Sequence, residues 1–434
     1  MILVEKIQIL SSHKEFKSLM EKLHLSKNLY NAALYDIRQH FFNTGEYKSW
    51  MKVSNEFISK NQQDFRALPS HLSQKILKKI GEQFSSFFAL LEKKKNGMYD
   101  KKIKIPDYKK FGGNFMLEWE GRLISQPLLR KGVVNPLGTN LKLNFRNLKF
   151  TGGTYSDGKL KTNIKQIRLI PVSKHQINVE ICYEIKEPTI KEFNGTIAGI
   201  DLGINNLFTV GINNKRGFLI KGTKLKSINQ YYNKKLSVLQ SELQTNYNKN
   251  KKSNDEKTSN AIIKLTRKRN NKILDFLHKS TRILVNQLVE SDVAKVVIGK
   301  NIGWKQDIKI GKRNNQNFVY IPHSKAIKIL CYKLKMKGIE VEICEESYTS
   351  KASFIDMDDI PVYGKNKTKQ EFSGKRIHRG LYISMNGTKI NADLNGALNI
   401  LRKSKVKSNK FDIQACSFMP LGIHYEIPKM RINN

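Results

Sequence analysis

The sequence predicts a multidomain protein that combines a β-barrel domain, a helical insertion and a larger α/β domain. The 434 residues are enough for two to four domains, and 39% hydrophobic residues are enough for packed cores. Apolar residues recur at a helical period early in the chain and then alternate with polar residues. Later they form buried strands separated by helices. These three patterns predict the three parts.

The charge balance indicates a polyanionic partner. Lys and Arg number 78, Asp and Glu number 37, and the formal net charge is +41. A charge of this size attracts polyanions and repels other copies of the same chain. Because aromatic and aliphatic residues are spread along the whole chain, the sequence excludes a disordered basic tail protein.

Cysteine usage and hydropathy indicate a protein inside the cell. The cysteines are far apart and form no CxxC pair, so we expect no disulfide framework and no four-Cys zinc site. The N-terminus, MILVEKIQIL, is too short and too charged for a signal peptide, and no apolar run approaches the roughly 18 residues that span a bilayer. We therefore expect a cytoplasmic protein without a membrane partner.

The first half of the chain predicts a β domain interrupted by helices. Residues 1–11 read as a strand, and residues 12–96 carry two strong apolar stripes at a helical period, with basic residues on the other faces. Residues 97–192 return to short alternating segments separated by glycine pairs and asparagines. We expect residues 1–11 and 97–192 to form one β-barrel domain, with residues 12–96 as its helical insertion.

The second half predicts an α/β domain over residues 193–403. The runs IAGIDLG, LFTVGI and FLIKG read as three antiparallel strands, and a long basic helical hairpin follows at residues 223–290. Next come the strand AKVVIG, a helix, the strand IEVEICEE and the last helix, ADLNGALNILRK. This order is typical of an RNase H-like fold. For residues 404–434, a C-terminal tail, the sequence predicts no element.

Two aspartates in this domain are candidates for metal-dependent chemistry. Asp201 lies within an apolar strand and is followed by Gly203, where a substrate backbone can approach closely. Asp393 lies in the first turn of the last helix. Alternatively, Asp201 pairs with a basic side chain and Asp393 only complements the helix dipole. Converging carboxylates bind two divalent cations in phosphodiester cleavage, and oxygen ligands favour Mg²⁺ or Mn²⁺ over zinc.

The motifs of the second half resemble TnpB-type proteins. The segments that carry the resemblance are IAGIDLGINNLFTVG, GWKQ, NNQNFVYIPH, EESYTSKASFID, FSGKRIHRG and NADLNGALNI. TnpB-type proteins are transposon-encoded, RNA-guided DNA endonucleases related to compact type V CRISPR effectors. The resemblance implies a RuvC-like nuclease domain, a wedge-like β-barrel domain and a helical recognition domain. It also implies guide RNA and target DNA as partners of a monomeric chain.

One departure from the family concerns the third carboxylate. The family's Glu at the end of the fourth strand is missing, since that strand reads VVIGKN. Glu345 and Glu346 end the neighbouring strand, and alternation allows only one of them to face the site. We prefer Glu346, which is nearer the strand end, and keep Glu345 as the alternative. The predicted catalytic and metal-binding residues are Asp201, Glu346 and Asp393. Alternatively, both glutamates are solvated and the nuclease is impaired.

A second departure concerns zinc. Family members often carry two CxxC pairs before the last helix, but residues 347–390 contain no cysteine. We therefore predict no structural zinc.

Basic and amide residues near these motifs are candidate nucleic-acid contacts. Lys and Arg neutralise phosphates without reading sequence, and aromatic rings stack on bases. Any single basic run, such as Tyr99–Lys110, can also be an ordinary solvated face. The predicted contacts are Asn205, Asn206, Lys268, Arg269, Trp304, Lys305, Gln306, Lys375, Arg376 and Arg379.

Together these features predict an RNA-guided DNA endonuclease with a two-metal site. One alternative is an RNA-guided DNA-binding repressor without nuclease activity, which the missing fourth-strand Glu favours. The other alternative is a guide-independent transposase with the same fold.

Overall fold

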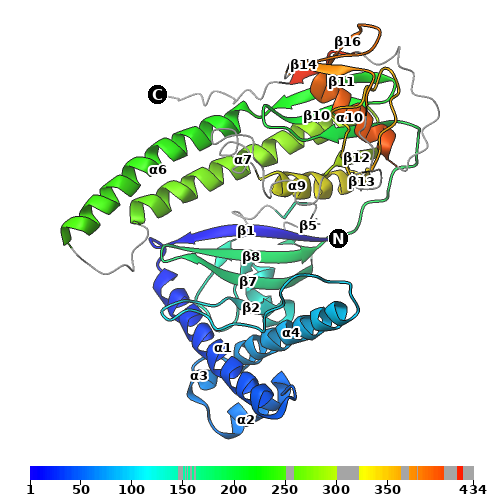
Figure 1. Ribbon diagram of the computed structural model, residues 1–434. Helices are drawn as coiled ribbons and strands as arrows, with labels where there is room; N and C mark the ends of the chain where they lie inside the picture. Colours follow the sequence, from blue (N-terminus) through cyan, green and yellow to red (C-terminus); the bar gives the residue numbers. More distant parts are fainter. Residues whose placement is uncertain are drawn as a thin grey trace. The chain divides into compact units, whose positions relative to one another are not determined.

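The computed structural model describes residues 1–144, 150–151, 153, 155–156, 159–160, 163–250, 259–300, 322–362, 371–378, 380–404 and 418–423. The chain forms two compact units, Met1–Glu187 and Pro188–Asn434 (Figure 1). The mixture of sheets and helices agrees with the expected class, while the finer division into four parts stays a prediction. No helix among the described residues is long and apolar enough to cross a membrane.

The first unit is built on an antiparallel sheet of four strands. Their order is β1 (Ile2–Leu10), β8 (Gln176–Glu184), β7 (Asn163–Ser173) and β2 (Leu117–Glu120). On β2, Trp119 is completely buried, and its indole N–H donates to the Leu137 carbonyl at 2.8 Å. Closure of this sheet into a barrel stays a prediction.

Short elements complete the β part of this unit. They are the 3₁₀ turn at Gly121–Leu123, α5 (Gln126–Arg130), the pair β3 (Val133–Val134) and β4 (Leu143–Asn144), and the pair β5 (Tyr155–Ser156) and β6 (Lys159–Leu160).

The helices of the first unit follow the apolar stripes of the sequence. They are α1 (Phe16–Thr44), α2 (Trp50–Ser59), α3 (Gln63–Arg66) and α4 (Ser70–Lys95). The stripes of α1 and α4 are buried, because apolar residues three and four apart share one helix face. On α1 this leaves a second, partly exposed face for other contacts.

The second unit contains a mixed sheet of six strands. Their order is β13 (Glu340–Cys344), β12 (Lys295–Gly299), β9 (Ile197–Asp201), β10 (Asn206–Ile212), β11 (Lys215–Lys221) and β17 (Leu421–Ile423). Strands β9, β10 and β11 are antiparallel, β12 is parallel to β9, and β13 is parallel to β12. The strand β17, within the segment for which the sequence predicts no element, pairs in parallel with β11.

Helices cover both faces of this sheet (Figure 1). The long pair is α6 (Thr223–Asn250) and α7 (Asn260–Glu290), and α9 (His323–Lys335) packs beside α7. The last helix, α10 (Ala392–Lys403), packs on β9 and β10 and follows a small sheet of β14 (Lys375–His378), β15 (Leu381–Ile383) and β16 (Lys389–Asn391).

Alternation along β9 decides which side chains meet α10. Ala198 and Ile200 belong to the core formed with α7 and α9, whereas Ile197 packs with Ile400 and Leu401 of α10. Since successive side chains point to opposite faces, Gly199 and Asp201 share the α10 face with Ile197. The same alternation on β12 places Val297 and Gly299 on that face.

Glycines let α10 lie directly on the sheet. A Cβ at Gly199 would overlap the carbonyl oxygen of Ala397, and a Cβ at Gly211 would lie 2.8 Å from Leu398 Cδ2. Any larger residue at these positions would push α10 outward, together with Asp393 in its first turn.

We therefore expect Gly199→Ala to destabilise the second unit. Overpacking in a tight contact costs about 1–3 kcal/mol, so the melting temperature followed by circular dichroism falls. Gly380→Ala is the matched control, because nothing lies within 4 Å of its added Cβ. Equal melting temperatures for the two variants would contradict the direct contact between α10 and β9.

Candidate active site

Asp201 ends β9 in a strongly unfavourable electrostatic environment. Burial, followed by the charges of Glu346 and Asp393, raises the pKa of Asp201 to about 8, although Arg376 acts in the opposite direction. A carboxyl group in this environment is largely protonated at neutral pH unless a cation compensates the charge. The structure therefore brings the three carboxylates that the sequence singled out into one electrostatic cluster.

Asp393 is held by the helix start and by two side chains. The Asn391 side chain caps α10 by accepting from the backbone N–H groups of Asp393 and Leu394, both at 3.1 Å. Asp393 Oδ2 accepts from Asn206 Nδ2 at 2.8 Å, and Oδ1 accepts from Arg376 Nη2 at 3.1 Å. Both carboxylate oxygens thus have partners from elements remote in sequence.

Glu346 lies beside the position where β12 lacks a side chain. An ideal Cβ on Gly299, the last residue of β12, would be 2.6 Å from Glu346 Oε2. The space that a side chain at Gly299 would fill is therefore partly occupied by the Glu346 carboxylate. A glutamate that follows the neighbouring strand β13 therefore reaches the end of β12, although β12 itself carries no acid.

Glu345 has a different environment. Its carboxylate accepts from Lys403 Nζ and, at 2.7 Å, from the backbone N–H of Ser347. Burial alone would raise the pKa of Glu345, but these hydrogen bonds hold it below the ordinary value. Glu345 is paired with Lys403, and Glu346 is the glutamate whose charge acts on Asp201.

Two buried asparagines of α10 fix the loop that follows Glu346. Asn395 Nδ2 donates to the Ala352 carbonyl at 2.8 Å, and Asn399 Nδ2 donates to the carbonyls of Ala352 at 2.7 Å and Thr349 at 3.0 Å. The Thr349 hydroxyl in turn donates to the Glu346 carbonyl at 2.8 Å. The helix that carries Asp393 thereby also positions Glu346, a role that the sequence reasoning missed although the two asparagines recur four residues apart on a buried face.

The loop after Asp201 is also tied to its neighbours. The Gly203 carbonyl lies 3.2 Å from Nε2 of the buried His323, and Asn205 Oδ1 accepts from Lys226 Nζ on α6. With Asn206 bonded to Asp393, both asparagines of the predicted contact set make contacts within the protein. Sequence reasoning missed His323 as a residue that supports this loop.

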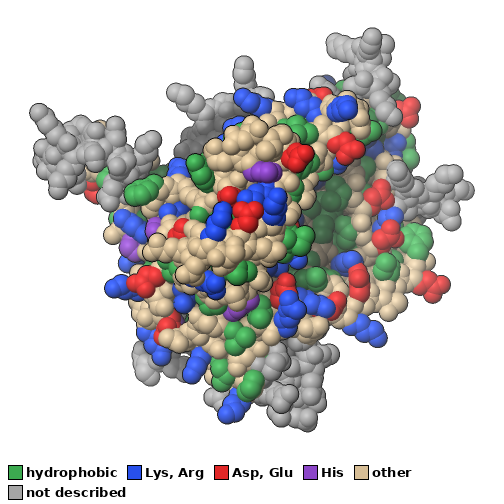
Figure 2. Space-filling view, turned by 90° about the horizontal axis from the view of Figure 1, so that it is seen from below, with side chains coloured by type: hydrophobic (Ala, Val, Ile, Leu, Met, Phe, Trp, Pro, Cys, Tyr) green, Lys and Arg blue, Asp and Glu red, His purple; other side chains and the backbone are tan. Residues whose placement is uncertain are grey.

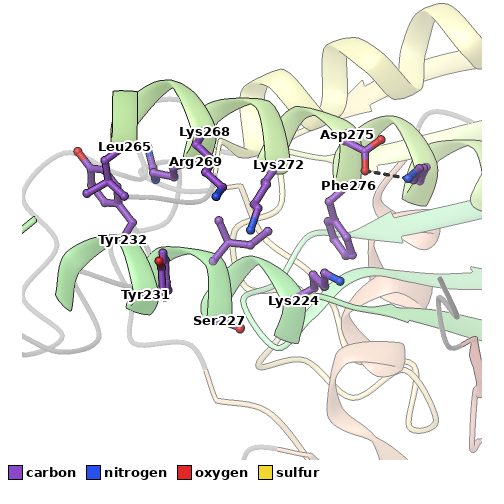
Figure 3. Close-up of a pocket in the computed structure, with 12 residues that line it drawn as sticks. Lys224, Ser227, Tyr231, Tyr232, Leu265, Lys268, Arg269, Lys272, Asp275 and Phe276 are labelled. Carbon is purple, nitrogen blue, oxygen red and sulfur yellow. Dashed lines mark ion pairs between the residues drawn. The ribbon is translucent and has the colours of Figure 1, made fainter. Parts of the chain in front are cut away.

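The helices α6 and α7 enclose a basic groove of about 510 Å³ (Figure 3). Lys224 and Tyr231 line it from α6, while Lys268, Arg269 and Lys272 line it from α7. Arg269 donates from Nε to Asn229 Oδ1 at 2.8 Å, and its guanidinium carbon is 5.1 Å from the centroid of the Tyr232 ring. Apolar side chains, Ile228, Leu265 and Phe276, complete the lining.

Of the remaining predicted nucleic-acid contacts, the structure describes two. Lys375 is exposed on β14, and its neighbour Arg376 is the ion-pair partner of Asp393. The predicted contacts Trp304, Lys305, Gln306 and Arg379 lie outside the described residues. No role for these four follows from the structure.

The described residues contain no group of three or more His, Cys, Asp or Glu side chains arranged to hold a metal ion as they lie. The three carboxylates still form an oxygen-only donor set with excess negative charge, which fits a hard divalent cation. Arg376 supplies the only opposing side-chain charge among the causes of the Asp201 shift.

Two protein-family models match parts of this chain. The family OrfB_IS605, described as a probable transposase, matches residues 180–305, and the Cas12f1-like TNB domain family matches residues 323–400. These two ranges contain Asp201, Glu346 and Asp393. They confirm the resemblance to TnpB-type proteins that the motifs indicate.

Particular relatives are similar over most of the chain. The TnpB-like protein ORF457 of Acidianus two-tailed virus is 25% identical over 429 residues, which cover 92% of this chain and 86% of the viral protein. Among solved structures, a Cas12f1–sgRNA–target DNA complex matches with 16% identity and a TM-score of 0.49, covering 89% of this chain and 81% of that one. Identity and TM-score at this level are too low to carry a functional conclusion.

The environment of Asp201 predicts a pH-dependent stability. A carboxyl whose pKa is higher in the folded than in the unfolded state stabilises the fold at low pH and loses this contribution as the pH rises through about 8. Asp201→Asn cannot ionise, so we expect it to raise the melting temperature of the metal-free protein more at about pH 9 than at about pH 5. Thermal unfolding in the presence of a chelator measures this difference, and an equal effect at both pH values would contradict the assignment.

Proposed function

We propose that this protein is an RNA-guided DNA endonuclease that hydrolyses phosphodiester bonds with divalent metal ions. The observation that carries the proposal is the cluster of Asp201, Glu346 and Asp393, in which burial and the two neighbouring carboxylates raise the pKa of Asp201 to about 8. The matches to the OrfB_IS605 and Cas12f1-like TNB families support a nuclease of the TnpB type. The viral relative, which is named a TnpB-like protein, matches over 86% of its own length.

The three carboxylates would hold the metal ions. Bound Mg²⁺ or Mn²⁺ would stabilise the charge on the attacking and leaving oxygens of the DNA phosphate. Asn206 holds Asp393 in place, and the asparagines of α10 hold the segment that carries Glu346. In the metal-free protein Arg376 neutralises Asp393. This arrangement keeps the repelling carboxylates together before a cation binds.

The basic surface would hold the nucleic acids. Figure 2 shows Lys and Arg side chains dispersed over one face, with apolar and acidic side chains between them. In the α6–α7 groove, Lys224, Lys268 and Lys272 make no ion pair with any described residue. We propose that they contact phosphates, while base pairing with a guide RNA selects the DNA sequence.

The fold fits this function. In the sheet, β9, β10 and β11 are antiparallel, and β12 and β13 add in parallel beside β9. This arrangement supports an RNase H-like, RuvC-type nuclease domain. We further propose a wedge-like β-barrel, a helical recognition domain and a monomeric ribonucleoprotein.

Two observations favour a second candidate function. The last residue of β12 is Gly299 rather than an acid, and Asp393 is ion-paired with Arg376. Both features suit an RNA-guided DNA-binding protein that represses by occupancy without cutting. The printed description of the OrfB_IS605 family, a probable transposase, leaves a guide-independent transposase as the third candidate.

The test is DNA cleavage by the purified ribonucleoprotein with Mg²⁺ and a matched target. We expect Asp201→Ala and Glu346→Ala each to slow cutting by more than about 100-fold, because each removes a charge that would hold the metal. Glu345→Gln is the matched control and should cut at a rate close to that of the wild type. The double variant Gly299→Glu/Glu346→Ala should recover part of the activity, since it places a carboxylate directly on β12.

Each alternative has its own outcome in this assay. Tight RNA-dependent binding of the target without any cutting by the wild type would support the repressor. Cutting without RNA would support the transposase. Wild-type cutting by Glu346→Ala would exclude Glu346 as the third carboxylate.

A further inference from the structure

A strap of the chain, residues 106–116, lies along α1 in the first unit and contains a turn at Phe111 and Gly112. The Asn31 side chain pairs with the backbone of Lys109, donating to its carbonyl at 2.9 Å and accepting from its N–H at 2.8 Å. The Ser26 hydroxyl donates to the Met116 carbonyl at 3.2 Å, and the Phe115 N–H donates to the Leu23 carbonyl at 3.0 Å. Hydrogen bonds therefore fix the strap to α1 at several points.

Cations and aromatic rings alternate where the strap meets α1. Lys109 Nζ lies 4.5 Å from the ring centroid of Tyr30 and 5.2 Å from that of Phe115. Arg38 lies 4.8 Å from the ring of Tyr108 and 5.5 Å from that of Phe42. Tyr30 is buried, whereas Tyr108 and Phe42 are exposed, so these two rings offer aromatic surface beside the positive charge of Arg38.

Phe111 is the most unusual residue of this surface. Its relative exposure is 103%, so the ring buries nothing, and Lys27 Nζ is 6.0 Å from its centroid. The turn that carries it is closed by the Gly113 N–H, which donates to the Lys110 carbonyl at 3.0 Å, and Gly112 has φ +67°. A phenyl ring fully in water forgoes its hydrophobic stabilisation, yet here a fixed backbone presents it.

The surroundings of Phe111 are basic. Lys110 directly precedes Phe111, is exposed and makes no ion pair with any described residue, and Lys101, Lys102 and Lys104, earlier in the same segment, are also exposed. The acid of the strap, Asp107, is mostly exposed and lies 3.8 Å from Arg38. Apolar ring faces within a field of unpaired lysines fit a nucleic acid better than an apolar protein surface.

We propose that the strap and α1 form a binding site for unpaired RNA nucleotides, in which a base stacks on Phe111 and the neighbouring lysines contact phosphates. The inference rests on the proposed function for the identity of the partner. A single exposed ring requires an unpaired base, because bases within a duplex already stack on one another. In the proposed function the displaced DNA strand is unpaired only after target binding, whereas the RNA offers unpaired bases before any target is bound.

The test uses the full-length protein without target DNA and without metal ions. A 15-nucleotide oligouridine RNA labelled with fluorescein measures affinity by anisotropy, with a 15-base-pair DNA duplex as the second probe. We expect Phe111→Ala to weaken RNA binding about 5-fold to 150-fold and Phe111→Trp to retain it, because either aromatic ring can stack. Phe193→Ala is the control, since Phe193 is also exposed (53%) but lies in the second unit.

A second readout locates the contact. Irradiation of a complex with RNA that contains 4-thiouridine should crosslink the tryptic peptide of residues 111–122, which begins at Phe111. Unchanged RNA affinity of Phe111→Ala together with no crosslink in this peptide would overturn the proposal. So would a loss of duplex DNA binding without a loss of RNA binding. Failure of cleavage in the assay above would leave this result unaffected, because binding needs neither target nor metal.

Discussion

The direct packing of α10 on the central sheet is the contact on which the candidate site depends. Gly199 and Gly211 leave no side chain between the helix and the strands, so the first turn of α10 reaches the end of β9. Gly396 of α10 continues this approach, because a Cβ there would lie 3.2 Å from Asp201 Oδ2. The buried asparagines of the same helix then hold the segment that follows Glu346. One packing contact thus sets the positions of three carboxylates from three parts of the chain.

The negative charge around Asp201 is not fully neutralised by basic side chains. A protein with a net charge of +41 could neutralise any acid with a nearby lysine, and Glu345 shows this with Lys403. Around Asp201, by contrast, burial and two neighbouring carboxylates outweigh Arg376, and the pKa of Asp201 rises to about 8. Concentrated negative charge within a basic protein is costly, which is consistent with a site that binds cations next to bound polyanions.

Much of the α/β unit and part of the site could be predicted from sequence. The buried run around Asp201 and the helix start at Asp393 are local patterns. The sequence also drew attention to Glu345 and Glu346, but both lie beyond the end of β13 at Cys344, so strand alternation could not choose between them. The contact of Glu346 with the space at Gly299 could not be predicted, because it depends on how two strands and one helix pack. The roles of Arg376 and the α10 asparagines escaped prediction for the same reason, since their partners are remote in sequence.

The proposed binding surface of the first unit could also not be predicted from the sequence. The run Tyr99–Lys110 shows basic and aromatic residues, but the sequence alone could not distinguish a solvated face from a binding surface. Only the hydrogen bonds from α1 reveal that the strap is fixed and that Phe111 is presented to solvent. The strand β17 could likewise not be predicted, because it forms by pairing with the edge strand β11, which is remote in sequence.

The most direct test of the carboxylate cluster is anomalous diffraction from crystals soaked in Mn²⁺. The account predicts a manganese peak in contact with Asp201, Glu346 and Asp393, with Arg376 displaced from Asp393. Manganese bound elsewhere, or bound here without Glu346, would contradict the central claim that a glutamate from beyond β13 completes the site.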